Sequence, residues 1–285
     1  MKVLVTGSGG SIGSEICRQL DADNELILLG HSELPLYTID KQLNGKRSIV
    51  LADIRDYSRV KQVMDQYSPD VIYHCAAIKH VPLAELHPCE AVLTNIVGTR
   101  NVAQACMTRM VLVSTDKAVN PISVMGKTKR VAELFCGSMG VTVVRLGNVI
   151  GSSGSVVPLF QSQIDSGGPV TVAHEQVDRY FITIDKAAAF IIRHGLHAGL
   201  YIPDMGRPVN IYQLAQKMIK ESGKNVQIEF TGLRQGDKLH EELRYPDEGD
   251  SVRAVDRDRL EEQIAVLEYY AKQGKTEKAL NELHR

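Results

Sequence analysis

The sequence lacks the features that define several broad classes of protein. No stretch of its 285 residues approaches the roughly 18 to 20 consecutive apolar residues of a membrane-spanning helix. Neither sign of charge dominates, because 33 Lys and Arg face 34 Asp and Glu, a formal net charge of -1. A protein that binds nucleic acid through its phosphates needs a basic excess. We therefore expect neither nucleic acid nor a membrane among its partners.

The cysteines lack the pairing and spacing of a disulfide frame or a zinc site. They are odd in number, scattered and without a Cys-x-x-Cys spacing, which is typical of reduced thiols in a cytoplasmic protein. The histidines show no metal-ligand spacing, so we expect no metal. The chain becomes glycine-rich too early for a signal peptide. The cysteines are Cys17, Cys75, Cys89, Cys106 and Cys136.

Short apolar strands alternate with longer amphipathic segments through the first half of the chain. Apolar runs without polar alternation are typical of parallel strands buried on both faces. The alternation predicts an α/β fold with a doubly wound parallel sheet, the Rossmann architecture, over residues 1–150. The predicted strands are Lys2–Thr6, Glu25–Leu29, Ser48–Leu51, Val71–His74, Met110–Ser114 and Val141–Leu146. The predicted helices are Ser11–Leu20, Leu34–Asn44, Ser58–Gln66, Pro88–Cys106 and Val124–Cys136.

The regular alternation of strands and helices ends after the sixth predicted strand. Gly147–Ser155 is rich in glycine and serine, which predicts a loop. Mixed short elements follow, and they are too irregular for a second Rossmann unit. We predict a smaller mixed substrate-binding lobe over residues 151–285, with some segments returning to the Rossmann domain. Its clearest elements are a helix at Ile211–Ser222, a strand at Val226–Phe230 and an amphipathic helix from about Arg257.

A glycine triplet joins the first predicted strand to the first helix. Glycine at these three places permits a tight turn, a close backbone approach to a pyrophosphate and close helix–strand packing. The helix start adds free N–H groups and the positive end of its dipole. A triplet alone would also fit a structural turn, but its place after the first strand predicts a dinucleotide site. The residues that we assign to it are Gly7, Ser8, Gly10, Ser11, Ile12 and Gly13.

The end of the second predicted strand bears on the choice of cofactor. An acidic residue there favours NAD, because it accepts a hydrogen bond from the ribose 2′-hydroxyl and repels a 2′-phosphate. This chain has His31 and Ser32 instead, so we expect NADP or NAD, with NADP favoured. Asp53 is placed to meet the adenine, although it would also suit a helix N-cap. The other predicted cofactor contacts are Ile54, Ala76 and Ala77.

Two motifs suggest the chemistry. Ser114-Thr115-Asp116-Lys117 ends the fifth strand, at the edge where doubly wound sheets bind ligands, and Met125-Gly126-Lys127-Thr128-Lys129 follows on a helix. With them the chain resembles an extended short-chain dehydrogenase/reductase of the polysaccharide-biosynthesis branch, which contains nucleotide-sugar 4,6-dehydratases. The resemblance runs from Val5 to Leu243, over the stretches VTGSGGSIGSEI, HCAAIKHVPLAE, NIVGTRNV, VSTDKAVNPISVMGKTKRVAE, RLGNVIGSSGSVVPLF and RQGDKLHEEL.

The chain departs from the wider superfamily at one catalytic position. Most members carry Tyr-x-x-x-Lys, whose phenol removes a hydroxyl proton; here Met125 stands in its place and Lys129 remains. Either catalysis is lost and the protein senses a dinucleotide, or another group does the acid–base work. Asp116 and Lys117 put an acid beside a base and favour the second explanation. This pattern is similar to UDP-N-acetylglucosamine 4,6-dehydratases that retain the configuration at C5.

The resemblance implies a role for each residue of this centre. Lys117 would remove the C5 proton, which requires a pKa lowered by burial or by a cation such as Lys129. Asp116 would protonate the departing C6 hydroxyl, Thr115 would bind the C4 oxygen, and Lys129 would hold the nicotinamide ribose. The implied product is a UDP-4-keto-6-deoxy sugar for surface polysaccharide. A nucleotide-sugar epimerase is the nearest alternative.

A UDP-sugar also requires local cations at its diphosphate. Arginine suits this task because its planar fork pairs bidentately with phosphate oxygens, although surface arginines are usually just solvated. Glu241 or Glu242 would accept from a ribose hydroxyl. The resemblance further implies a homo-oligomer and, in a branch whose members often carry a membrane portion, a soluble short form. The matched substrate positions are Lys79, His80, Asn148, Arg179, Arg234 and Glu241.

Overall fold

The computed structural model describes residues 1–152, 154–195 and 197–284. Within them lies a seven-stranded sheet in the order β11-β6-β5-β4-β1-β2-β3, in which all neighbours are parallel. The order reverses between β1 and β4, the switch point of a Rossmann sheet, and confirms the predicted doubly wound fold. Its strands are β1 (Lys2–Thr6), β2 (Glu25–Gly30), β3 (Arg47–Leu51), β4 (Val71–His74), β5 (Arg109–Thr115), β6 (Thr142–Leu146) and β11 (Leu200–Tyr201).

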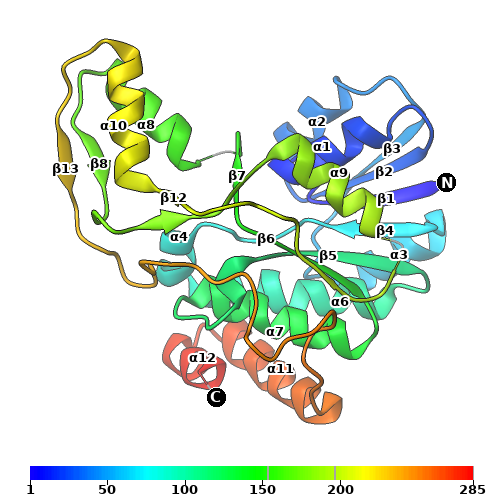
Figure 1. The fold of residues 1–285 in the computed structure, drawn as a ribbon. Coiled ribbons are helices and arrows are strands. Elements are labelled where there is room, and N and C mark those ends of the chain that lie inside the picture. The colour runs from blue at the N-terminus through cyan, green and yellow to red at the C-terminus, as the bar shows by residue number, and fades with distance from the viewer. Residues whose placement is uncertain (153, 196, 285) are drawn as a thin grey trace.

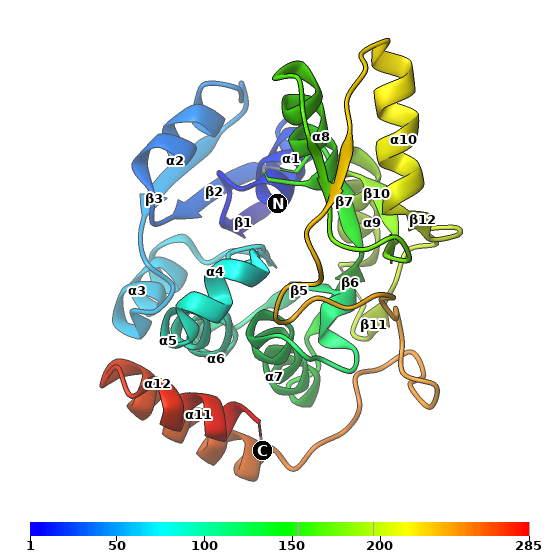
Figure 2. The same ribbon diagram turned by 90° about the vertical axis from the view of Figure 1, so that its left-hand side faces the viewer.

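Helices cover both faces of this sheet (Figures 1 and 2). Successive side chains of a strand point to opposite faces, so Val3 and Val5 lie in one buried cluster and Leu4 in the other. The cluster around Val3 and Val5 is closed by α1 (Ser11–Leu20), α2 (Glu33–Asp40) and α9 (Ile184–His194).

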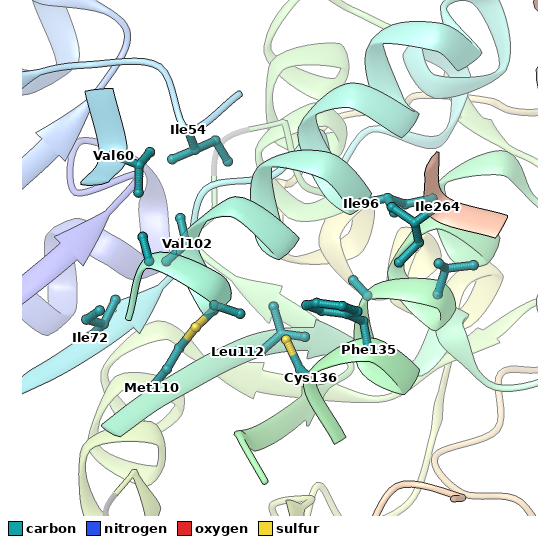
Figure 3. Close-up of a cluster of buried hydrophobic side chains, with 14 of the residues drawn as sticks. Ile54, Val60, Ile72, Ile96, Val102, Met110, Leu112, Phe135, Cys136 and Ile264 are labelled. Carbon is teal, nitrogen blue, oxygen red and sulfur yellow. The ribbon is translucent and has the colours of Figure 1, made fainter. Parts of the chain in front are cut away.

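The cluster around Leu4 is the larger core. Figure 3 shows Ile72, Met110 and Leu112 of the sheet packed beneath helical side chains such as Val102 and Phe135. The two C-terminal helices form an outer layer over this side (Figure 2). The elements on this face are α3 (Tyr57–Tyr67), α4 (Val81–Leu86), α5 (Pro88–Ala91), η1 (Val92–Gly98), α6 (Thr99–Ala105), α7 (Val124–Ser138), α11 (Arg257–Lys272) and α12 (Thr276–Leu283).

Two predicted helices differ from the structure. The single helix predicted at Pro88–Cys106 contains a π-helical segment, η1, in its middle, where each N–H bonds one residue further back than in an α-helix. The helix predicted at Leu34–Asn44 ends at Asp40, after which Arg47 bonds the Asp40 side chain and backbone.

A smaller lobe stands apart from the sheet (Figure 1). Its core contains Phe160, Ile164, Val170 and Ala215. The predicted helix at Ile211–Ser222 is confirmed, and the strand predicted at Val226–Phe230 is shorter. The lobe's elements are α8 (Val156–Asp165), β8 (Val170–Val172), α10 (Ile211–Ser222) and β13 (Ile228–Phe230), with β9 (Asp178–Arg179) and β12 (Val209–Asn210) pairing at its base.

The predicted loop Gly147–Ser155 is wrong in part. Asn148–Ile150 forms β7, which pairs in parallel with β10 (Phe181–Thr183). Ser153 lies outside the described residues. Later segments return to the sheet, since α9 packs on α1, β11 extends the sheet beside β6, and α11 and α12 pack on α5 and α7. The domain boundary at residue 150 stays a prediction. In the part of the chain that the structure describes, no helix has the length and apolarity to span a membrane.

Candidate active site

The glycine turn after β1 is a cradle that side chains would fill. Gly7 has φ +63°, and a Cβ on it would lie 2.8 Å from the Ala76 backbone nitrogen. A Cβ on Gly13 would lie 2.3 Å from the Gly7 carbonyl oxygen, so only glycine lets α1 start this close to the turn. The positive end of the α1 dipole therefore lies beside the turn, where it would stabilise a phosphate group. This geometry fits a dinucleotide.

A cavity of about 380 Å³ adjoins this turn, within the usual size of ligand pockets. Four strand ends contribute to its wall, because the carboxyl ends of parallel strands share one edge. The predicted residues that line it are Gly7, Gly10, His31, Ser32, Asp53, Ile54, Ala76 and Ala77. The other predicted cofactor residues lie elsewhere: Ser8 is buried with its hydroxyl on the Leu29 carbonyl, Ser11, Ile12 and Gly13 lie in α1, and Lys129 lies on α7.

An ion-pair network that the sequence did not reveal lies at this cavity. The Arg55 guanidinium contacts the Asp53 carboxylate at 2.6 Å and that of Glu90 at 2.7 Å, and all three residues line the cavity. Burial alone would raise the pKa of Asp53, but the hydrogen bonds and the charge of Arg55 together hold it below its ordinary value. Asp53 is not the cap of α3, since Asp56 accepts from the Arg59 N–H there. The network thus brings one guanidinium and two carboxylates to the cavity, and Arg55 is already paired with both.

The end of β5 brings Thr115, Asp116 and Lys117 into contact. The fully buried Asp116 accepts through Oδ1 from the Thr115 hydroxyl at 3.0 Å and from Lys117 Nζ at 2.9 Å. Its second oxygen, Oδ2, has no hydrogen-bond partner among the described residues. Lys117 Nζ also donates to Asn148 Oδ1 at 3.2 Å. Three predicted catalytic residues and one predicted substrate residue therefore meet in one hydrogen-bonded group.

The charge environment of Lys117 is opposite to the predicted one. Burial alone would lower the pKa of its ammonium, but the carboxylates of Asp116 and Glu241 outweigh burial and raise that pKa above its ordinary value. Glu241 Oε1 lies 3.4 Å from Nζ. The nearby cation is Arg179, not Lys129 as predicted. The expectation of a lowered Lys117 pKa is thus wrong, because the sequence did not show the second carboxylate.

Met125 and Lys129 lie one turn apart on α7. Met125 is 3% exposed and packs in the core cluster around Leu4, with no atom that exchanges a proton. Lys129 is buried, and its Nζ donates to the Val113 carbonyl at 2.7 Å. Burial lowers the pKa of Lys129, with Glu133 opposing the shift in part. The predicted contact of Lys129 with a nicotinamide ribose stays a prediction.

The remaining predicted substrate residues are divided between two places. Arg179 is buried, and its guanidinium donates to the carbonyls of Asp178, Lys238 and Leu239. Lys79 and His80 are exposed after β4, and Arg234 is exposed on the loop after β13, where its N–H donates to Asp237. The structure thus brings Asn148, Arg179 and Glu241 to Lys117 and leaves the other three at the surface.

Two buried asparagines, missed by the sequence analysis, fix the loops of the cavity. Asn95 on η1 accepts from the Ile78 N–H at 2.8 Å and donates to the Ile78 carbonyl and to Thr128 Oγ1, both at 3.0 Å. Asn101 on α6 donates to the carbonyls of Ile54 and Arg55. The stretch NIVGTRNV contains both residues, but only the fold shows which loops they hold.

A buried histidine links the same elements. His74, at the end of β4, lies between the hydroxyls of Thr6 at 2.7 Å and Thr99 at 3.0 Å. Burial, and to a smaller extent the charge of Lys129, lowers the pKa of His74 to about 3. The imidazole is therefore neutral at pH 7 and bridges β1 to the start of α6.

Comparison with known proteins identifies the family. Residues 3–261 match the family described as "Polysaccharide biosynthesis protein", and this chain belongs to it. It is 47% identical to the capsular polysaccharide biosynthesis protein CapD of Staphylococcus aureus, over 85% of this chain and 44% of that protein. The chain thus spans less than half the length of that relative.

Relatives with other names match more distantly. A UDP-N-acetylglucosamine 4,6-dehydratase (inverting) of Campylobacter jejuni is 32% identical, over 84% of this chain and 76% of that protein. A UDP-glucose 4-epimerase of Rickettsia prowazekii is 29% identical, over 85% of this chain and 76% of that protein. The sequence is therefore similar to both nucleotide-sugar dehydratases and epimerases.

Solved structures show the same fold. Pen from Bacillus thuringiensis superposes with a TM-score of 0.81 at 33% identity, covering 87% of this chain and 84% of that one. DesIV, a dTDP-glucose 4,6-dehydratase of Streptomyces venezuelae solved with NAD and TYD bound, gives 0.74 at 22% identity, covering 95% and 97%. At 22% identity the second likeness shows the fold alone.

Proposed function

We propose that this chain catalyses the 4,6-dehydration of UDP-N-acetylglucosamine to its 4-keto-6-deoxy product, with retention at C5, for surface polysaccharide. The observation that carries the proposal is the hydrogen-bonded Thr115-Asp116-Lys117 group at the carboxyl end of β5. An elimination needs an acid and a base at once, and each contributes about 10²–10⁴-fold. Met125, at the place of the usual tyrosine, leaves this acid–base work to Asp116 and Lys117.

The glycine cradle and its cavity fit a nicotinamide dinucleotide, which supplies the redox chemistry when bound, oxidising C4 and later reducing C6. Oxidation of C4 releases the proton of its hydroxyl, and loss of the C6 hydroxyl as water consumes one. The Thr115 hydroxyl, which donates to Asp116 over 3.0 Å, provides a path for the released proton to that carboxylate.

Asp116 then passes this proton to the departing C6 hydroxyl. Lys117 removes the C5 proton in its amine form and returns it once C6 is reduced. Because the carboxylates of Asp116 and Glu241 raise its pKa, the fraction in the amine form grows with pH. The protein therefore ends each turnover with the protons that it had at the start, and no tyrosine is needed.

For the cofactor, NADP is our proposal. The wall of the cavity at the end of β2 has His31 and Ser32 in place of an acidic residue, and Arg55 adds a guanidinium that lines the cavity. A 2′-phosphate would find donors in these three side chains, with Arg55 exchanging its contact with Asp53 or Glu90 for one with the phosphate. Binding of each dinucleotide to the wild type and to Arg55→Met tests the choice: NADP should lose more affinity than NAD.

The proposed reaction is tested by incubating the protein with UDP-N-acetylglucosamine and analysing the product by mass spectrometry. We expect a product lighter by one water, and an isomer of unchanged mass would show epimerisation instead. Lys117→Ala should abolish the product while the dinucleotide still binds. Lys127→Ala, on the same helix as Lys129 but outside the proton path, is the matched control. A homo-oligomer and a cytoplasmic location stay predictions.

A further inference from the structure

The segment 238–248, here called the strap, crosses the turn that carries Asp116 and Lys117. Lys238 Nζ donates to the Val119 carbonyl at 2.6 Å. Farther along, the Tyr245 hydroxyl accepts from the Asn120 N–H at 2.9 Å and donates to the Ala118 carbonyl at 3.3 Å. The strap is thus bonded to all three residues that follow Lys117.

Glu241 is the strap residue that points at Lys117. It is 6% exposed, and its Oε1 lies 3.4 Å from Lys117 Nζ and 3.9 Å from Arg179 Nε. Its Oε2 has no hydrogen-bond partner among the described residues, since Lys238 Nζ is 3.7 Å away. Burying a carboxylate is costly unless a charge compensates it, and Lys117 is the nearest such charge.

We propose that Glu241 is a positioning residue for the acid–base pair: it fixes the Lys117 ammonium between two carboxylates and sets how readily that ammonium gives up its proton. The inference rests on the proposed function and assigns Glu241 to Lys117 rather than to a ribose hydroxyl. The charged groups that face Lys117 are Asp116 from its own turn, Glu241 from the strap and Arg179 from β9. Lys238 faces Glu241 from the strap itself.

The arrangement has a clear chemical use. During the elimination Asp116 becomes neutral when it receives the C4 hydroxyl proton, so its attraction for the Lys117 ammonium disappears. Glu241 keeps its charge throughout and stabilises the ammonium that forms when Lys117 takes the C5 proton. Before the reaction the same charge favours the ammonium over the amine that acts as the base, so the rate of this step should rise with pH.

The test measures Lys117 directly, without turnover. Its side chain is 19% exposed, so a small reagent such as acetic anhydride reaches the amine, and peptide mass spectrometry follows the extent of labelling against pH. Glu241→Gln keeps the shape and removes the charge. We expect its labelling curve to move to lower pH by about one unit or more, the effect typical of an opposite charge within 4–6 Å.

Two further variants make the result specific. Glu242→Gln changes the next strap residue, which is exposed and accepts from Asn120 instead, and its curve should match the wild type. Glu241→Asp keeps the charge and should restore the curve in part. In the product assay, the acid limb of the rate profile of Glu241→Gln should move in the same direction as its labelling curve.

The outcomes separate the two proposals. A shifted labelling curve without any dehydrated product keeps the role of Glu241 and contradicts the proposed function. An unshifted curve for Glu241→Gln, or an equal shift for Glu242→Gln, overturns the role of Glu241 whether or not product forms.

Discussion

Asn95 provides the most direct test of how the fold shapes the cavity that we propose for the dinucleotide. It is fully buried on the π-helix η1, and its amide holds both backbone groups of Ile78, in the loop that contributes Ala76 and Ala77 to the cavity wall. The change that we consider is Asn95→Ala, which removes this amide and leaves the loop without its clamp.

The magnitude follows from the hydrogen bonds that are lost. Asn95 makes three, to the Ile78 N–H, the Ile78 carbonyl and Thr128. At about 1 kcal/mol each, their loss lowers the free energy of unfolding by about 3 kcal/mol. Ordering one freed backbone residue costs a further 1–2 kcal/mol or so at the binding step, which raises the Kd for the dinucleotide about 5- to 30-fold.

The two effects are measured separately. Urea unfolding followed by circular dichroism reports the stability, and the fluorescence of the reduced dinucleotide reports its affinity. Gln163→Ala is the matched control, since its amide makes two hydrogen bonds to Thr171 in the lobe. That variant should lose stability and keep its affinity. An Asn95→Ala protein whose Kd for the dinucleotide lies within twofold of the wild-type value would refute the role of Asn95 in holding this loop.

Two further predictions concern buried charge. Arg145→Met should lower the free energy of unfolding by about 3–5 kcal/mol, because it leaves Arg130 alone to compensate the two buried carboxylates of Glu133 and Glu248. Arg257→Met at an exposed pair should cost at most about 0.5 kcal/mol. Equal melting temperatures of the two variants would contradict this. Burial lowers the pKa of His74 to about 3, so between about pH 6.5 and 3 the imidazole is protonated in the unfolded chain only. Over this range the free energy of unfolding decreases by about 1.4 kcal/mol for each unit by which the pH is lowered. Urea unfolding at pH 7 and pH 5 should show the wild type losing about 2 kcal/mol more than His74→Gln, and equal losses would rule the effect out.

Local sequence patterns predict much of the Rossmann half. The bounds of β1, β4, α1 and α10 agree with the prediction to the residue, because continuous apolar runs and helix-start residues are local signals. The short strands β7 and β10 escaped prediction, since each is three residues long and is defined only by a partner from a distant part of the chain. The π-helix escaped for a related reason. Its apolar pattern is that of an α-helix, and its buried Asn95 has its partners outside the helix.

The sequence predicts which residues meet at the end of β5, but not the direction of the pKa shift of Lys117. Thr115, Asp116 and Lys117 are neighbours in the sequence, so their meeting required no knowledge of the fold. The charge of Lys117 depends on Glu241, which the strap brings back from much farther along the chain. A prediction from burial alone has the direction of that pKa wrong, although burial is the largest single influence on it. A motif therefore identifies candidate acid–base groups, while distant residues that the fold brings to them determine the direction of their pKa shifts.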